Sequence, residues 1–241
     1  MEEAMKSLPG DARTLLQTPR KSKIIPMEHG QYTHFGIPEG IRYIIETSGT
    51  ITRLPEEIHL SFNIDGLPLT KSSKSQLWPI LGCFRHFKNK SPFIIGAFHG
   101  YKKPPEADVF LKYFIEEAEM LAENGFTWTD TTSKFIIDCF RCNAPARAYI
   151  CCIKSHGGYY ACGKCETKDK FIGKVIYPEM NAPLRTAESF ITQSQPEHHI
   201  GISPLLDSIS SDAVASRRQL SIATGPNEIG SVNPEISTAS L

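Results

Sequence analysis

Apolar and polar side chains alternate most clearly over residues 58–65, which read Ile-His-Leu-Ser-Phe-Asn-Ile-Asp and end at Gly66. A period of two is typical of a strand with one buried face. Two more short apolar runs, residues 77–84 and 92–98, are bounded by polar or turn residues. The pattern predicts three consecutive strands joined as an antiparallel meander. Pro79 favours an edge or early position within the second strand, because proline cannot donate to a ladder.

The period changes to three or four residues after Pro105, which suits a first helical position. Apolar residues recur at positions 107, 110, 111, 114, 118 and 121, and Asn124-Gly125 supplies a stop signal. This predicts one amphipathic helix whose acidic face is a solvated surface. A further apolar run at residues 135–140 predicts a returning strand. Three strands, a helix and a fourth strand predict a mixed α/β domain.

The two ends of the chain lack such patterns. Residues 1–30 are largely polar and show no sustained period, and no aromatic residue follows Phe190. Segments without bulky apolar side chains cannot offset the entropy lost on ordering. We therefore expect a disordered arm over residues 1–30, a folded domain over 31–192 and a disordered tail over 193–241.

The overall charge predicts no general attraction to nucleic acid or membrane, because 26 Lys and Arg residues balance 26 Asp and Glu residues. No stretch approaches the roughly 20 apolar residues of a membrane span, and the first residues do not resemble a secretory signal. We expect a soluble, intracellular protein without a membrane partner. Any attraction to nucleic acid must come from a local patch.

One stretch offers such a patch, since residues 66–105 contain seven basic residues and no acidic one. These residues are Lys71, Lys74, Arg85, Lys88, Lys90, Lys102 and Lys103. A basic sheet edge can follow a phosphate backbone and release counterions from it. The prediction is weak, sequence-tolerant DNA binding, and the alternative is a set of solvated loop residues.

Cysteine is concentrated, with six of the seven residues lying between positions 139 and 165. Cys152, His156, Cys162 and Cys165 supply three thiols and one imidazole with the spacing x3, x5 and x2. That donor set is typical of a structural zinc site closed by four protein ligands. The sequence therefore predicts a zinc knuckle over residues 152–165.

Three alternatives remain for these cysteines. Cys139 and Cys142 also form a four-cysteine ribbon with Cys162 and Cys165, although Cys139 lies in a predicted buried strand. Cys162 and Cys165 alone have the spacing of a redox pair. Free thiols without metal are the third alternative.

Asp65 stands at the end of an apolar strand directly before Gly66. From that position a carboxylate can face a divalent cation at the edge of a sheet. An aspartate before glycine is also a common turn residue.

Four segments together resemble a known family. They are Asn-Ile-Asp-Gly-Leu-Pro-Leu at 63–69, Gln-Leu-Trp-Pro-Ile-Leu at 76–81, Asn-Ala-Pro-Ala-Arg-Ala at 143–148, and Pro-Leu-Arg-Thr at 183–186 with Glu-Ser-Phe at 188–190. With the Cys/His knuckle, these segments are similar to transposase-derived proteins with a ribonuclease-H-like core, which are widespread in animal genomes. The similarity covers roughly residues 30–192.

The resemblance implies a partial ribonuclease-H-like mixed sheet with a flanking helix, an inserted zinc knuckle and a nuclear location. It also implies a two-metal phosphoryl-transfer site, with Mg²⁺ held by carboxylates and Asp65 as the first of them. The family's second carboxylate lies immediately before Ala-Pro-Ala, where this chain has Asn143. A neutral amide is a poorer ligand for a hard cation.

The third acid of such enzymes comes from a later helix, and no helical pattern follows Phe190. Asp138 lies too far upstream of position 143 to replace the second acid. We therefore expect a truncated, catalytically inactive transposase-derived protein, a domesticated transposon product stabilised by Zn²⁺, that binds DNA or a protein partner. An active metal-dependent transposase or nuclease and a thiol oxidoreductase are the alternatives.

Overall fold

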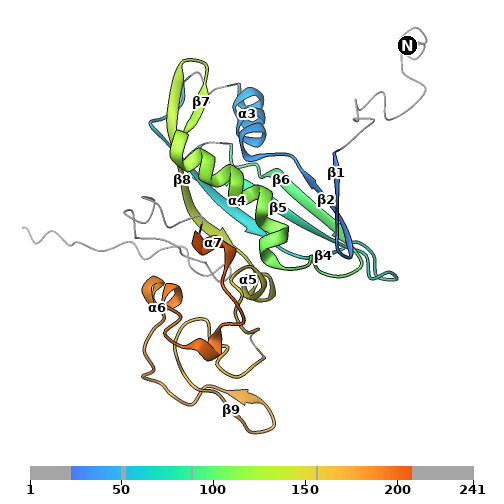
Figure 1. Cartoon of the computed structure of the whole chain (residues 1–241). Coiled ribbons are helices and arrows are strands. Elements are labelled where there is room, and N and C mark those ends of the chain that lie inside the picture. The colour runs from blue at the N-terminus through green and yellow to red at the C-terminus, as the bar shows by residue number, and fades with distance from the viewer. Residues whose placement is uncertain (1–22, 50–52, 88, 156, 208–241) are drawn as a thin grey trace, which may run out of the picture.

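The computed structural model describes residues 23–49, 53–87, 89–155 and 157–207. It is a mixed α/β structure with a curled sheet, its helices and a smaller lobe formed by residues 151–203 (Figure 1). The main sheet contains β1 (Ile24–Met27), β2 (Gly30–His34), β3 (Glu57–Ile64), β4 (Leu67–Pro68), β5 (Gln76–Phe84), β6 (Phe93–Gly100), β7 (Phe126–Trp128) and β8 (Thr131–Arg141). The helices are α3 (Ile37–Ser48), α4 (Ala107–Asn124), α5 (Ala144–Ile150), α6 (Ala187–Ile191) and α7 (Pro204–Asp207).

The strand order is β1-β2-β6-β5-β3-β8-β7, with β4 paired to β5. β3, β5 and β6 form an antiparallel meander, as predicted, because short turns connect them. After β6 the chain crosses through α4 and returns as β8, which pairs with β3 in parallel. The ends of β3 and β8 therefore lie at the same edge of the sheet.

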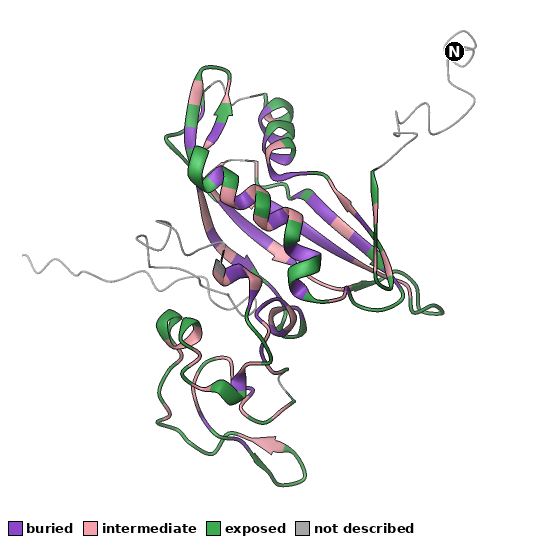
Figure 2. Ribbon diagram, viewed as in Figure 1, coloured by how far each residue is buried: buried purple, intermediate pink, exposed green. Residues whose placement is uncertain are grey.

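Helices α3 and α4 cover one face of this sheet and enclose the core between them and the strands (Figures 1 and 2). Phe62 of β3 meets Phe114 of α4 edge-on, with ring centroids 4.9 Å apart, and Phe140 of β8 is tilted against Phe62 and edge-on to Phe114. Gly40 lets α3 approach closely, because a Cβ there would lie 2.0 Å from the ring of Phe93.

The predicted strands and the amphipathic helix are confirmed by β3, β5, β6, β8 and α4, with helix α4 ending at Asn124. The helix begins at Ala107, after Pro105, and its N-cap is Glu106. Pro79 does not lie at a sheet edge, because β5 runs between β6 and β3. It is tolerated because pairing with β3 stops at Ile80, so Pro79 is paired on the β6 side only.

Order extends past both predicted boundaries of the domain. The arm predicted over residues 1–30 includes β1, which pairs with β2 from Ile24 to Met27, while residues 1–22 lie outside the described part. The tail predicted from residue 193 includes the 3₁₀ turn Pro196–His198 and α7. His198 is 1% exposed and Leu205 is 2% exposed, so side chains other than Phe, Tyr and Trp are buried in this segment. Residues 208–241 lie outside the described part.

The smaller lobe contains a hairpin of β9 (Lys170–Phe171) and β10 (Val175–Ile176), α6 and the 3₁₀ turn. Isolated bridges join Ile153 to His199 and Cys165 to Leu184. Figure 2 shows that most of this lobe is exposed or half-buried, whereas the strands of the main sheet are largely buried. Apolar burial alone therefore supplies little of its stability.

Across the described ranges, no helix combines the length and apolar character that a membrane crossing requires.

Candidate functional site

Asp65 and Asn143 meet at the edge of the sheet where β3 and β8 end. The parallel register pairs Asn63 with Arg141, so Asp65 and Asn143, each two residues further along, lie side by side. Asn143 Nδ2 donates to Asp65 Oδ1 at 2.5 Å, and the backbone N–H of Gly66 donates to the same oxygen at 2.7 Å. Asn143 Oδ1 accepts from the N–H of Ala146 at 2.8 Å and so caps helix α5.

This arrangement has a direct chemical consequence. The Asn143 side chain turns its N–H toward Asp65 and its oxygen toward the helix, so it presents a donor where a metal ion needs an acceptor. No three His, Cys, Asp or Glu side chains within the described ranges are grouped to hold a metal ion. Within the described residues, Asp65 is therefore not part of an assembled acidic triad.

The carboxylate of Asp138 contacts other side chains, away from Asp65 and Asn143. Its carboxylate is 7% exposed and lies 2.9 Å from His59 Nδ1 and 3.5 Å from Arg85 Nη1. A register shift between Leu60 and Ser61 leaves Asp138 without a paired residue in β3. The bulge turns Asp138 toward His59, well before the strand end that carries Asn143, so it does not act as the missing acid.

The basic residues do not form one patch. Lys71 and Lys74 lie in the loop between β4 and β5, and Lys102 and Lys103 follow β6. Gln76 pairs with Gly100, and Ser75 Oγ lies 2.9 Å from His99 Nε2, so these two loops are neighbours. We call the exposed side chains of Lys71, Lys74, Lys102 and Lys103 the sheet-end surface. It lies at the same edge as Asp65.

The other basic residues lie at the opposite end of β5. Arg85 directly follows this strand, and Lys90 lies in the loop before β6, while Lys88 is outside the described residues. The nine residues of β5 separate the two groups. The first and last residues of this strand lie roughly 26 Å apart, at about 3.3 Å per step. Arg85 also pairs with Asp138, so its charge is partly compensated.

Cys162 and Cys165 are brought together, with 3.4 Å between their sulfur atoms. Burial raises the pKa of Cys162, but hydrogen bonds from the backbone N–H groups of Lys164 and Cys165 outweigh it, and the pKa falls below the ordinary thiol value. Burial and the neighbouring Cys162 raise the pKa of Cys165. The two neighbouring thiols lose their protons as a pair, which favours a thiolate donor.

The other predicted ligands are not assembled around this pair. The Cys152 sulfur lies 3.8 Å from the carbonyl oxygen of Tyr149, and the carboxylates nearest to it are Asp108 and Glu106 of the α4 region. His156 lies outside the described residues. The ribbon set is not assembled either, because Cys142 is 6% exposed in the main core, where burial raises the pKa of its thiol to about 11.

Buried polar atoms in the lobe test whether a metal ion fits there. Among the described residues of the lobe, both carboxylate oxygens of Asp169, Thr167 Oγ1 and His199 Nε2 are buried without a hydrogen-bond partner. Such atoms are rare in folded proteins. The thiol pair supplies two metal donors, but among the described residues no third His, Cys, Asp or Glu side chain joins it to complete a metal site.

Two arginines that sequence reasoning did not single out hold the Cys162–Cys165 loop. Arg185 Nε donates to the carbonyl oxygen of Cys162 at 2.8 Å. The guanidinium of Arg147 lies against Gly163, where any side chain would collide with it. In the sequence, these arginines were marked only by their positions in segments 143–148 and 183–186, which carry the family resemblance. Both place positive charge beside the thiols and favour a thiolate.

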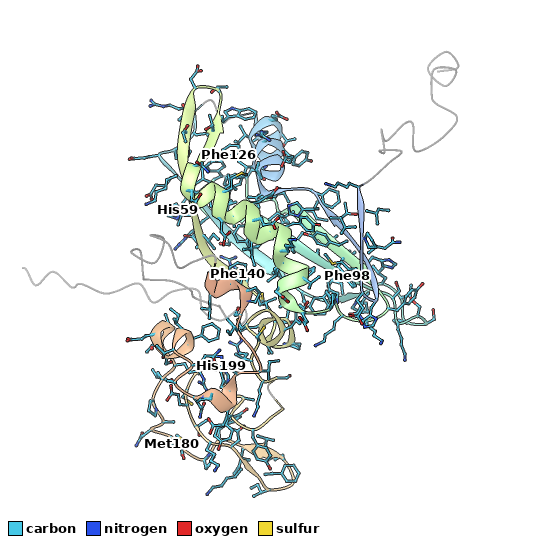
Figure 3. All side chains as sticks on the ribbon, in the orientation of Figure 1. His59, Phe98, Phe126, Phe140, Met180 and His199 are labelled. Atoms are coloured by element: carbon cyan, nitrogen blue, oxygen red, sulfur yellow. The ribbon has the colours of Figure 1, made fainter. Side chains whose placement is uncertain are left out.

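A small pocket of about 360 Å³ opens at the far end of the sheet, lined by Pro55, Glu57, His59, Phe84, His86 and Phe87. His59 is labelled in Figure 3. Its Nδ1 contacts Asp138, and its Nε2 lies 3.1 Å from the Glu57 carboxylate. Sequence reasoning missed it because a lone histidine in an alternating strand carries no distinctive pattern.

Comparison with known proteins finds no match to this chain, either among family models or among curated proteins.

Proposed function

We propose that this protein is a catalytically inactive, transposase-derived DNA-binding module with a ribonuclease-H-like sheet and a zinc-stabilised lobe. The observation that carries the proposal is the hydrogen bond from Asn143 Nδ2 to Asp65 Oδ1. Two-metal phosphoryl transfer needs anionic ligands on both cations, and this pair offers one carboxylate and one N–H donor.

The strand arrangement supports the ribonuclease-H-like part of the proposal. An antiparallel meander, a crossing helix and a strand parallel to the first give the local order β6-β5-β3-β8. This order places Asp65 and position 143 side by side, as the resemblance requires of the first two carboxylates.

Zinc is proposed as a structural ion of the lobe. Cys162 and Cys165 would hold it, with Cys152 and His156 as the remaining predicted ligands. A thiolate-rich closed site contributes folding energy and leaves no position open for a catalytic water. The 3.4 Å separation of the two sulfur atoms supports a shared ion at this pair.

The sheet-end surface is the proposed site of duplex DNA contact. Its four lysines are exposed, and Lys103 Nζ lies 5.3 Å from the ring of Tyr149 on α5, the helix that Asn143 caps. The degenerate site and the positive charge therefore share one edge of the sheet.

A thiol oxidoreductase is the second candidate, favoured by the 3.4 Å separation of the two sulfur atoms and the lowered pKa of Cys162. The two functions separate on metal content, because a redox pair must be free of zinc. Reversible disulfide formation in zinc-free protein would support the oxidoreductase.

The purified protein should not cleave or join DNA strands with Mg²⁺ or Mn²⁺, because only one carboxylate faces the site. The measurement is a gel assay on end-labelled duplex DNA. Asn143→Asp tests the missing ligand, and Asp65→Ala is its matched control. Cleavage by the unmodified protein that Asp65→Ala abolishes would reject inactivity and establish the active-enzyme alternative.

The sheet-end surface should make duplex binding steeply salt-dependent. Changing Lys71, Lys74, Lys102 and Lys103 to glutamine should reduce the slope of log K against log[salt] by about 3.6 units, since each phosphate contact contributes about 0.9. Fluorescence anisotropy at several salt concentrations measures the slope. The charge-matched control changes exposed Lys23, Arg53, Lys112 and Lys134 to glutamine and should leave it unaltered. Equal slopes for both variants would locate binding elsewhere.

A further inference from the structure

Charge is segregated on the lobe within residues 154–178. Lys164, Lys168, Lys170 and Lys174 are exposed. The two acids of the segment are withdrawn from solvent, because Asp169 is 1% exposed and Glu166 is half-buried. Ser194 Oγ also donates to Glu166 Oε1 at 2.8 Å. This part of the lobe therefore presents a cationic surface, although the whole chain is neutral.

Aromatic rings are exposed on the same segment. Tyr159 is 51% exposed, Phe171 is 61% exposed and Tyr177 is 41% exposed. Phe171 pairs with Val175 across the hairpin, and Tyr177 follows Val175 by two residues. Because paired residues share a face, Phe171 projects from the same face of the hairpin as Val175, and Tyr177 follows directly after β10 ends at Ile176.

Lysines lie on the same short segment as these rings. Lys154 Nζ and Lys168 Nζ lie 5.6 and 5.8 Å from the ring centroid of Tyr160, the residue after Tyr159. Lys170 precedes Phe171 on β9, so its side chain projects from the other face of the hairpin. Lys174 lies across the hairpin turn, where Ile172 N–H donates to the Lys174 carbonyl oxygen at 3.0 Å.

We propose that this lobe surface, formed by Tyr159, Lys164, Lys168, Lys170, Phe171, Lys174 and Tyr177, binds single-stranded DNA. The inference rests on the proposed DNA-binding function but assigns a second surface, separate from the sheet-end surface. Unpaired bases stack on exposed aromatic faces, and lysines neutralise the intervening phosphates. Duplex DNA hides its base faces, so it can use the lysines but not the rings.

The lobe is a separate part of the molecule. Figure 3 places Met180 on the lobe, at the opposite end of the molecule from Phe126.

The test uses the full chain and fluorescein-labelled oligothymidine, followed by anisotropy. Phe171→Ala and Tyr159→Ala should each weaken binding by about fivefold or more, because each removes a stacking face. Phe171→Trp should preserve it. Changing Lys168, Lys170 and Lys174 to glutamine should reduce the salt slope by about 2 units, at about 0.7 for each phosphate on a single strand.

The matched controls are Met180→Ala and Leu184→Ala, which remove exposed, non-aromatic side chains of the same lobe, 93% and 74% exposed. Both should bind oligothymidine like the parent, and zinc content verifies that each variant keeps its lobe intact. Unchanged affinity in Phe171→Ala, an equal loss in the controls, or no affinity for oligothymidine would overturn the proposal. Tighter binding of oligouridine would replace DNA with RNA as the ligand.

The tests of the two proposed DNA surfaces have independent outcomes. If the sheet-end variant binds duplex DNA like the parent while Phe171→Ala loses oligothymidine, the duplex site is refuted and the lobe surface is supported. The reverse result supports the duplex site and overturns the lobe surface.

Discussion

Cys162→Ser should release zinc from the purified protein, which we expect to contain about one equivalent per chain. The change removes one of the two thiols that lie 3.4 Å apart. Structural zinc contributes about 10–16 kcal/mol of apparent binding free energy, which becomes folding free energy where no site exists in the unfolded chain. Because few side chains of the lobe are buried, it should lose protection from hydrogen exchange over residues 151–203. Elemental analysis and exchange mass spectrometry measure the two effects.

Cys83→Ser is the matched control for this prediction. Cys83 lies on β5, with its sulfur 3.3 Å from the carbonyl oxygen of Lys90, and its loss should leave zinc in place. Cys152→Ser then tests the knuckle set. Release of zinc by Cys139→Ser but not by Cys152→Ser would select the four-cysteine ribbon. Metal-free parent protein with an unchanged fold would rule out structural zinc.

Phe62→Ala should lower the free energy of unfolding by about 3–5 kcal/mol, the usual cost of emptying a phenylalanine site in a core. Phe62 is 1% exposed and contacts Phe114 of α4 and Phe140 of β8, so its loss opens a cavity where strands and helix meet. Since domains are stable by only about 5–15 kcal/mol, the variant should be partly unfolded at 37 °C. Urea titration followed by tryptophan fluorescence measures the change.

Tyr43→Ala provides the comparison, because Tyr43 lies on α3 and is 61% exposed. Its removal should change the free energy of unfolding by no more than about 0.5 kcal/mol. A cost below about 1 kcal/mol for Phe62→Ala would mean that the core does not close around this ring as described.

The main strands were predictable because one face of the sheet is buried under helices, which imposes the period of two on β3. Helix α3 was not predicted, although residues 37–48 form it. Its N-cap, Gly36, makes no side-chain hydrogen bond, and the N–H of Ile37 is bound at 2.7 Å by Glu117, which is 80 residues away. That contact is not local, but the sequence does carry local helix signals here, with Pro38 and Glu39 in the first turn and Gly49 as a left-handed C-cap. The same contact shows that the acidic face of α4 is not wholly a solvated surface.

The candidate site was predictable only in part. Parallel pairing of β3 and β8 brings Asp65 to position 143, as the resemblance implied, but the sequence does not show which way the Asn143 amide turns. The basic residues are contiguous in sequence and divided in space, because successive turns of a meander lie at opposite ends of the sheet. For the cysteines, spacing identified the close pair but not the position of Cys152, whose positive φ of 50° turns the chain there.

Asn143 has a structural role of its own. Its amide joins two elements at once, since the N–H holds the end of β3 through Asp65 and the oxygen holds the start of α5. An aspartate here can accept for the helix but cannot, when ionised, donate to Asp65, so it would set two carboxylates against each other. An acid at position 143 would therefore weaken the joint between strand and helix. The stability of the fold alone then favours the neutral amide at this position.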